Sequence, residues 1–376
     1  YNQHCILIKP SSGFKRLKDD VYEINPTSEK CYHKLFEILM KKNILPVEIA
    51  VLWNYTEKSF EIWQRHEFKH HLEHGIYTIF QMSKVLMKLS LAEKVRLLYI
   101  HHETKSHVQP HNRAITGFMK TVARENPKFE YKLIGLNKKR TSIDESIAII
   151  RDELSALESG SVEIKYEDGV RKIKRISVLR AKYSDKLNIR NSGVYLITGG
   201  LGALGIIFAK HLASRYNGKV ILTGRAKMDA KKDEICKEIQ KNGGEVNYIG
   251  ADVTKKEDIE SLIKEIKNKY GCINGIIHAA GVIDDAFIVK KELDSFKEVV
   301  APKIYGAMNI DECTRSEELD FLVLFSSATA ILGNLGQSDY AFGNAFLDAY
   351  AEYRSELVLE GKCSGHTIAI NWPLWN

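Results

Sequence analysis

The chain has 376 residues, of which 44% are hydrophobic and 27% charged, and it carries a formal net charge of +7. This length exceeds one ordinary core, so we expect two domains, and the balanced composition excludes a disordered or fibrous chain. Lysine and arginine alternate with acidic residues instead of forming one basic face, which argues against a nucleic-acid partner and favours an acidic protein partner.

Apolar runs and amphipathic stretches alternate through the first 150 residues. Strands are predicted at 5–9, 47–53, 95–101 and 131–136, and helices at 31–40, 75–89 and 114–124. This alternation predicts a parallel sheet with helices on both faces. Only four of the 25 glycines lie in this part, and the change in glycine content indicates a second domain after it.

Residues 161–180 follow a different pattern, because apolar and polar residues alternate on both sides of Asp168 and Gly169. This pattern predicts a β-hairpin, which we interpret as a bridge between the two domains. The stretches 18–23 and 137–144 are interpreted as surface loops without an assigned function.

From Gly193 onward the alternation of strands and helices is more regular. Strands are predicted at 194–198, 219–224, 245–250, 273–281, 319–327 and 366–371, and helices at 204–216, 229–242, 257–269, 293–313 and 339–356. This order is typical of a doubly wound, nucleotide-binding fold.

A glycine-rich segment follows the first strand of this second half. Gly200, Gly202 and Gly205 form G-x-G-x-x-G between a strand and a helix, the context in which backbone N–H groups bind a pyrophosphate. Arg225 ends the next strand, where an NAD enzyme carries a carboxylate. A guanidinium there binds a 2′-phosphate, so NADP(H) is the predicted cofactor. A structural glycine turn and a solvated arginine are the weaker alternatives.

A histidine-rich stretch in the first half, HEFKHHLEH at 66–74, fits the zinc-protease pattern H-E-x-x-H at its start. His66, His70 and His74 would share one helical face, and Glu93 could serve as a distant ligand. The longer metzincin pattern fails, because Glu73 stands where glycine is required and Ile76 where the third histidine is required. We therefore predict a solvated helix face and no metal site.

Four further motifs resemble the short-chain dehydrogenase/reductase superfamily: HAAG (278–281), PKIYGAMNI (302–310), FSSATA (325–330) and GQSDYAFGN (336–344). Together with TGGLGALG (198–205), LTGR (222–225) and ADV (251–253), they resemble the ketoreductase domain of modular polyketide synthases more closely. Ordinary short-chain enzymes carry Y-x-x-x-K, whereas here Asn344 lies four residues after Tyr340 and Lys303 lies upstream. Polyketide ketoreductases show the same exchange of lysine and asparagine.

The resemblance implies a role for each of these residues. Hydride arriving at a ketone carbon leaves charge on its oxygen, so a proton donor is needed, and Tyr340 is the expected donor. A phenol holds its proton tightly at neutral pH, and a nearby cation such as Lys303 makes it a better acid. Ser327 would hold the carbonyl oxygen, and Asn344 would organise Lys303 and a relay water. The expected cofactor-binding residues are Thr198, Gly199, Gly200, Leu201, Gly202, Leu204, Gly205, Arg225, Asp252, Val253, Ala279, Ala280, Gly281, Lys303, Tyr340 and Pro373.

The resemblance also implies an α/β architecture of two Rossmann-like subdomains. Residues 1–190 resemble the truncated, cofactor-free structural subdomain, with 114–127 as its most recognisable piece, and 191–376 resemble the NADPH-binding catalytic subdomain. Ile283, Asp284 and Asp285 are similar to the Leu-Asp-Asp of B-type members, which give the D-configured alcohol. Leu332 stands where an A-type member carries tryptophan, so B-type is expected.

The predicted function is NADPH-dependent reduction of a β-ketoacyl group tethered by phosphopantetheine to an acyl carrier protein, beside other domains of the same synthase. A free-standing short-chain alcohol dehydrogenase and a non-reducing scaffold or epimerase domain are the alternatives. Six cysteines without C-x-x-C spacing favour a reduced, cytoplasmic compartment. No apolar run reaches about 18 residues, so no membrane partner is expected. The first residue is not methionine, which suggests excision from a larger chain.

Overall fold

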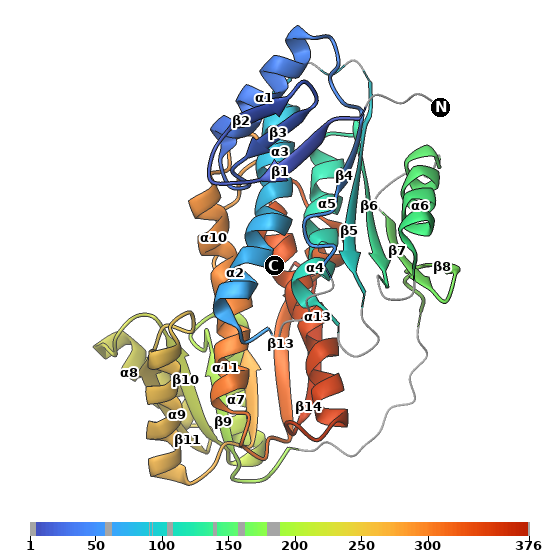
Figure 1. Ribbon diagram of the computed structural model, residues 1–376. Coiled ribbons are helices and arrows are strands. Elements are labelled where there is room, and N and C mark those ends of the chain that lie inside the picture. Colours follow the sequence, from blue (N-terminus) through green and yellow to red (C-terminus); the bar gives the residue numbers. More distant parts are fainter. Residues whose placement is uncertain are drawn as a thin grey trace.

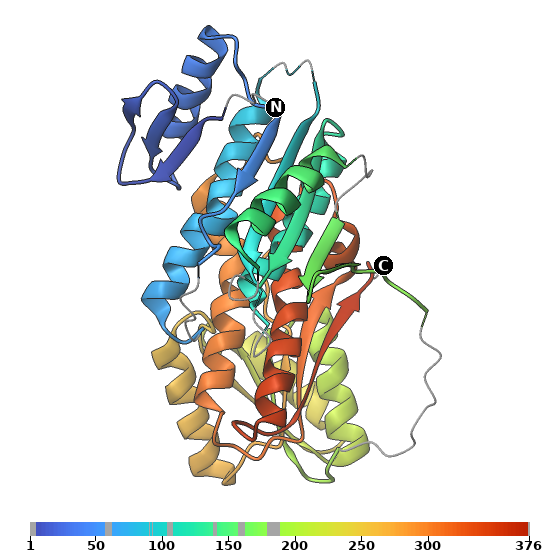
Figure 2. The same ribbon diagram turned by 45° about the vertical axis from the view of Figure 1, so that its right-hand side comes forward.

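The computed structural model describes residues 5–56, 62–89, 91, 93–103, 108–137, 141–156, 162–178 and 189–374. Two large sheets lie end to end, the first half of the chain forming one and the second half the other (Figure 1). A small third sheet, also formed by the first half of the chain, lies beside the first large sheet, and one helix packs on it (Figure 2). The α/β class with two Rossmann-like subdomains is therefore confirmed, while the division at residue 190 stays a prediction.

The small sheet has the order β1-β3-β2. Its elements are β1 (Leu7–Pro10), β2 (Lys15–Lys18), β3 (Val21–Ile24) and the following helix α1 (Glu29–Lys41). The interpretation of 18–23 as a surface loop is wrong, because β3 begins at Val21, and Tyr22 and Ile24 alternate with half-buried neighbours and bury their side chains in the core. The predicted helix at 31–40 is confirmed as part of α1.

The first large sheet has the order β4-β5-β6-β7-β8, and its strands are parallel except for the β7–β8 pair. Its strands are β4 (Glu48–Val51), β5 (Val95–His102), β6 (Phe129–Leu136), β7 (Val162–Glu167) and β8 (Val170–Ile173). Its helices are α2 (Arg65–Leu72), η1 (Glu73–Tyr77), α3 (Thr78–Met87), α4 (Pro110–Arg113), α5 (Ile115–Glu125) and α6 (Ile143–Ser155). Alternate residues of β5 face different cores, Leu97 toward α3 and α5 and Leu98 toward α6, so helices cover both faces.

Three sequence predictions for this half need correction. The helix predicted from residue 75 begins at Arg65, because the histidine-rich stretch continues into η1 and α3. Helix α6 was not predicted, although Ser142 and Glu145 form a capping box at its start, and 137–144 was interpreted as a loop. The predicted hairpin is present, with positive φ at both Asp168 and Gly169, as a tight turn of this type requires. It forms the edge of the first sheet instead of a bridge between domains.

The second large sheet has the order β11-β10-β9-β12-β13-β14, and all its strands are parallel. Its strands are β9 (Val194–Thr198), β10 (Lys219–Gly224), β11 (Glu245–Gly250), β12 (Gly275–His278), β13 (Phe321–Ser327) and β14 (His366–Trp372). Its helices are α7 (Ala203–Tyr216), α8 (Ala230–Gln240), α9 (Lys256–Tyr270), α10 (Leu293–Ala301), η2 (Pro302–Gly306), α11 (Ala307–Cys313), α12 (Ala328–Leu332) and α13 (Ser338–Leu359). The doubly wound order predicted from the sequence is confirmed, and its direction reverses between β9 and β12.

Helix α13 joins the two halves, because it packs against β13 and β14 and also against α4 and α5 of the first half (Figures 1 and 2). Within the second half, the guanidinium of Arg354 on α13 donates to the Asp311 carboxylate at 2.6 Å, and both side chains are fully buried. Within the described ranges, no helix is both long and apolar enough to cross a lipid bilayer.

Candidate active site

The glycine-rich loop lies where the sheet order reverses. Gly199 has a φ of +63°, and a side chain there would meet the backbone of Ala279 and Ala280 at 2.8 Å. The loops after β9 and β12 therefore touch, and only glycine permits this approach. Gly202 precedes the first turn of α7 and is exposed. Free N–H groups at such a helix start suit a phosphate ligand.

The remaining residues of the predicted phosphate loop support its shape. A side chain on Gly200 would meet Leu222 at 2.8 Å, and one on Gly205 would meet the Gly200 carbonyl at 2.7 Å. Leu201 and Leu204 pack against the core below the sheet. The loop is thus fixed by packing on one side, while Gly202 leaves the other side open.

Thr198 and His278 form a buried pair beneath this loop. The His278 Nε2 lies 3.0 Å from the Pro302 carbonyl, and Nδ1 lies 2.7 Å from the Thr198 hydroxyl. A carbonyl only accepts, so Nε2 carries the proton and Nδ1 accepts from threonine. Burial and the nearby Lys303 charge lower the pKa of His278 to about 3. The histidine of the HAAG motif is therefore a neutral structural link between β9, β12 and η2.

Arg225 follows β10 as an exposed side chain, and none of the described residues forms a hydrogen bond or ion pair with it. A free guanidinium at this strand end fits a 2′-phosphate. Asp252 uses one carboxylate oxygen to accept from the Thr254 N–H and hydroxyl at 3.0 and 2.8 Å. Val253 is buried, and Pro373 is exposed directly after β14.

Lys303 lies on η2 and is 5% exposed. Its ammonium group donates to the Phe325 carbonyl of β13 at 2.7 Å. Side chains on Gly281 or Gly343 would meet the Lys303 chain at 3.2 and 3.3 Å, so the lysine is enclosed by the β12 loop and α13. Burial lowers its pKa to about 8, while the Asp348 charge opposes this shift.

Ser327 lies at the end of β13, and Tyr340 and Asn344 lie on α13, which packs against that strand. Ser327 is the last residue of that strand, and its hydroxyl accepts from the Thr329 N–H at 3.2 Å. Tyr340 lies in the first turn of α13, and the Asn344 amide donates to its carbonyl at 2.8 Å. Asn344 is fully buried, yet its Oδ1 has no hydrogen-bond partner among the described residues. Such an orphan acceptor fits a water or a ligand hydroxyl.

The loop after β12 carries Asp284 and Asp285, and Leu332 is the last residue of α12. The Asp284 carboxylate accepts from Ser295, and the Asp285 carboxylate accepts from Gln337 at 2.9 Å. Leu332 is 57% exposed. Asp285 therefore connects its loop to the residue that precedes α13.

Sequence reasoning missed Asp348, which lies one helical turn beyond Asn344. Its carboxylate accepts from the Asn371 amide at 2.8 Å, and burial raises its pKa. The Asn371 amide also donates to the Ser327 carbonyl at 3.1 Å, so this pair holds the end of β13 against α13. The four-residue spacing of Tyr340, Asn344 and Asp348 was the available signal.

The histidine-rich face shows no arrangement suited to a metal. The rings of His70 and His74 lie 3.8 Å apart, and burial lowers the pKa of His74 to about 4. Within the described part of the chain, no group of three or more His, Cys, Asp or Glu side chains could hold a metal ion.

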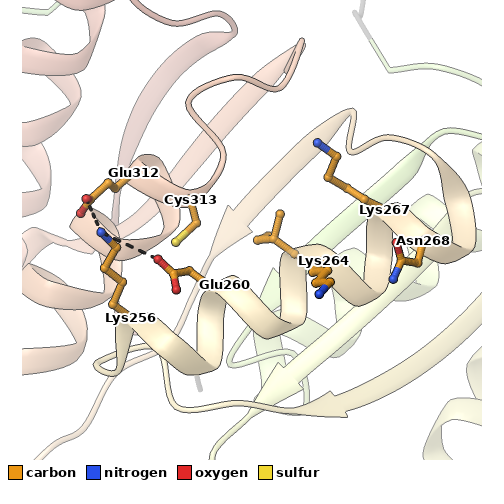
Figure 3. Close-up of a pocket in the computed structure, with 8 residues that line it drawn as sticks. Lys256, Glu260, Lys264, Lys267, Asn268, Glu312 and Cys313 are labelled. Atoms are coloured by element: carbon orange, nitrogen blue, oxygen red, sulfur yellow. Dashed lines mark hydrogen bonds and ion pairs between the residues drawn. The ribbon is translucent and has the colours of Figure 1, made fainter.

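A separate surface groove of about 500 Å³ lies between α9 and α11 (Figure 3). Glu312 and Glu260 both form ion pairs with Lys256 in it. Burial is the main cause that raises the pKa of Cys313 to about 11, so its thiol is a poor nucleophile. None of the predicted site residues lines this groove.

Comparisons with known proteins agree with this geometry. A family model described as KR domain matches residues 193–376, and one described as β-ketoacyl synthase-like, N-terminal, matches 1–153. The crystal structure of an N-terminal ketoreductase from the macrolactin assembly line is 34% identical, with a TM-score of 0.85, over 99% of this chain and 74% of that chain. A ketoreductase domain from the bacillaene assembly line is 32% identical, with a TM-score of 0.74, over 87% and 81%.

A parallel sheet with a glycine loop where the strand order reverses is typical of nicotinamide-dependent reductases of the short-chain type. The chain belongs to the ketoreductase domains of polyketide synthases, a family of oxidoreductases that reduce β-ketones. Polyketide synthase PksN of Bacillus subtilis (strain 168) is 38% identical over 265 residues, 69% of this chain. The chain spans only 5% of the length of that relative.

Proposed function

We propose that this chain reduces the β-keto group of an intermediate bound to an acyl carrier protein, with NADPH as the hydride donor. The observation that carries this proposal is the convergence of Lys303, the end of β13 and the first turns of α13. The Lys303 ammonium binds the Phe325 carbonyl, and the Ser326 hydroxyl donates to the Asn344 carbonyl at 3.0 Å. These contacts join η2, β13 and α13. Lys303 also lies against Gly281 in the loop after β12, and that loop touches the glycine loop at Gly199.

The cofactor proposal depends on the fit of the residues. NADPH, when bound, supplies the hydride. The N–H groups at the start of α7 would hold its pyrophosphate, and Arg225 would hold its 2′-phosphate. The free Arg225 side chain supports NADPH over NADH, because a guanidinium attracts the additional phosphate that a carboxylate would repel.

The residues of the chain then complete the reduction of the ketone. The Ser327 and Tyr340 hydroxyls would bind the ketone oxygen, and Tyr340 would transfer its proton to that oxygen as the C–H bond forms. The charged Lys303 would stabilise the phenolate left behind. The orphan Asn344 Oδ1 would hold a water that returns the proton to Tyr340.

We also propose the D-configured alcohol of the B-type. Asp285 lies against Gln337 at the entrance to α13, which supports a role for this loop in orienting the substrate. Leu332 is exposed at the end of α12, where an A-type member carries tryptophan. A carrier protein and further domains of a synthase are the proposed partners, since the curated relatives are long synthases and the net charge of +7 suits an acidic carrier surface.

The test is NADPH oxidation with a β-ketoacyl thioester of a short pantetheine mimic, followed by chiral separation of the product. We expect a D-alcohol, and we expect Tyr340→Phe to lower kcat by about 10²–10⁴ while NADPH still binds. NADPH binding without turnover by the wild type would favour a scaffold or epimerase domain, and an L-alcohol would contradict the B-type assignment.

A further inference from the structure

One face of α5, a helix of the first half, touches the catalytic half at three positions four residues apart. A side chain on Gly117 would collide with the Ala341 carbonyl, next to Tyr340. The Thr121 hydroxyl accepts from the Asn334 N–H at 3.3 Å. Glu125 ends the helix. Because residues four apart lie on one helical face, α5 presents a continuous stripe to the start of α13 and to the loops 284–288 and 333–337.

The Glu125 carboxylate binds two loops of the catalytic half at once. One oxygen accepts from the Ile288 N–H at 2.8 Å and the other from the Gly336 N–H at 3.0 Å. The Ala286 N–H in turn donates to the Gly336 carbonyl at 2.9 Å. The loop that carries Asp284 and the loop that precedes Tyr340 are thus joined through one carboxylate of the other half.

A buried ion pair connects the same two segments from inside. Lys291 and Asp339 are each 1% exposed, and their charged atoms lie 2.9 Å apart. The Lys291 ammonium also donates to the Asp284 carbonyl, and the Tyr340 N–H donates to the Asp339 carboxylate at 2.8 Å. The main chain of Tyr340 therefore depends on the position of the Asp284 loop.

We propose that Glu125 is a positioning residue for the reduction, which fixes the 284–288 loop and the 333–337 loop relative to Tyr340 and so selects the face of the ketone. This inference rests on the proposed function. It gives the cofactor-free half a specific part in the stereochemical outcome. Each of the two N–H groups donates to a different oxygen of Glu125, and glutamine would present an NH₂ group in place of one of them. One loop would then lose its anchor.

The test compares Glu125→Gln with the wild type in four measurements: amide hydrogen exchange by mass spectrometry, the ratio of D to L alcohol, the KM of the thioester, and the dissociation constant of NADPH. We expect exchange in peptides covering 284–288 or 333–337 to become about tenfold faster, in line with the loss of one hydrogen bond to a charged group. The D to L ratio should fall and the KM of the thioester rise, while NADPH binding stays within about twofold of the wild type.

Glu153→Gln is the matched control. The Glu153 carboxylate is buried in the first half and accepts from Lys132, Arg171 and Tyr166, all of that half. This variant should lower the Tm yet leave the product ratio and the exchange of both loops unchanged. Unchanged loop exchange in Glu125→Gln, or faster exchange with an unchanged product ratio and KM, would overturn the inference. An equal effect of Glu153→Gln on the product ratio would also overturn it.

Thr121→Val provides a second variant if Glu125→Gln fails to fold. It removes the acceptor of the Asn334 N–H with little change in shape, and we expect faster exchange only in the 333–337 loop. The exchange measurements decide the positioning of the loops even if the wild type does not reduce the thioester. Such inactivity would refute the proposed function alone.

Discussion

The two large sheets of this protein share a construction but differ at their carboxyl edges. The order β4-β5-β6-β7-β8 runs in one direction, whereas the second sheet reverses between β9 and β12. A reversal sends neighbouring loops apart and opens a crevice, which is where open α/β sheets bind ligands. The first sheet has no such point among its described strands. Strand order, as well as the glycine loop, therefore distinguishes the second half from the first.

The polar groups at the two edges differ in the same way. In the first half, the Asn54 amide donates to the Tyr99 hydroxyl at 2.8 Å, and Tyr99 donates to Asn112 at 2.7 Å. These hydrogen bonds connect the segment after β4 to β5 and α4. In the second half, Asn344 Oδ1 and Asp348 Oδ1 are buried without a hydrogen-bond partner among the described residues. Asn54, Tyr99 and Asn112 thus satisfy one another, whereas the second edge, which we call the open edge, has buried acceptor oxygens left over.

The largest expected effect concerns the buried ion pair of the second half. Asp311→Asn leaves the buried Arg354 guanidinium without its charged partner, and we expect a loss of about 3–5 kcal/mol in the free energy of unfolding. Urea denaturation measures it. Arg354→Met with Asp311→Leu, which removes both charges, should recover much of the loss. A single variant as stable as the wild type would show that the pair is not what joins α13 to α11.

The next effect tests the open edge. Arg225→Ala should raise the KM for NADPH by about 10–100-fold, since a hydrogen bond to a charged group contributes about 1.5–3 kcal/mol. The KM for NADH should change little, because NADH lacks the 2′-phosphate. Steady-state kinetics with both cofactors give the ratio. An equal rise in the KM for NADPH and the KM for NADH would show that Arg225 does not bind the 2′-phosphate.

The matching variant in the first half is Asn54→Ala. It leaves the buried Tyr99 hydroxyl without one partner, so we expect a loss of about 1–3 kcal/mol in the free energy of unfolding. The KM values for NADPH and for the thioester should remain those of the wild type. A selective rise in either KM would show that the carboxyl edge of the first sheet also takes part in binding NADPH or the thioester.

The lowered pKa of Lys303 predicts that kcat depends on pH. Its folded pKa of about 8 means that the ammonium is charged below that pH and loses its charge as the pH rises. We therefore expect kcat to fall above about pH 8. In Lys303→Met this fall of kcat at high pH should disappear. Asp348→Asn removes the charge that raises the pKa of Lys303, so kcat should begin to fall at a lower pH.

The lowered pKa of Lys303 also affects stability, and stability changes with pH in the opposite direction to kcat. Folding lowers the Lys303 pKa, so its ionisation costs stability below about pH 8, and this cost disappears as the pH rises toward the ordinary value of 10.5. The stability difference between the wild type and Lys303→Met should thus shrink with rising pH. A pH-independent difference would contradict a buried, charged lysine.

The sequence could predict the second sheet almost entirely, because its strands are long apolar runs with glycine between them. It could not show that β12 ends at His278, since the HAAG segment continues the apolar run. It also missed β3 and α6, which are short or polar on the surface. The predicted catalytic residues were accessible through local motifs. Glu125 and Lys291 were not, because their contacts join segments far apart in the chain.

The smallest expected effect concerns an exposed pair at the opposite end of the second sheet. Arg190 binds Asp320 through two hydrogen bonds of 2.6 and 2.7 Å, but the Arg190 side chain is 54% exposed. Solvent screens such a pair, so Asp320→Asn should cost less than about 1 kcal/mol in the free energy of unfolding. Urea denaturation at low and high salt measures it, and the difference should vanish at high salt. A loss as large as that of Asp311→Asn would mean that burial does not decide the strength of ion pairs in this half.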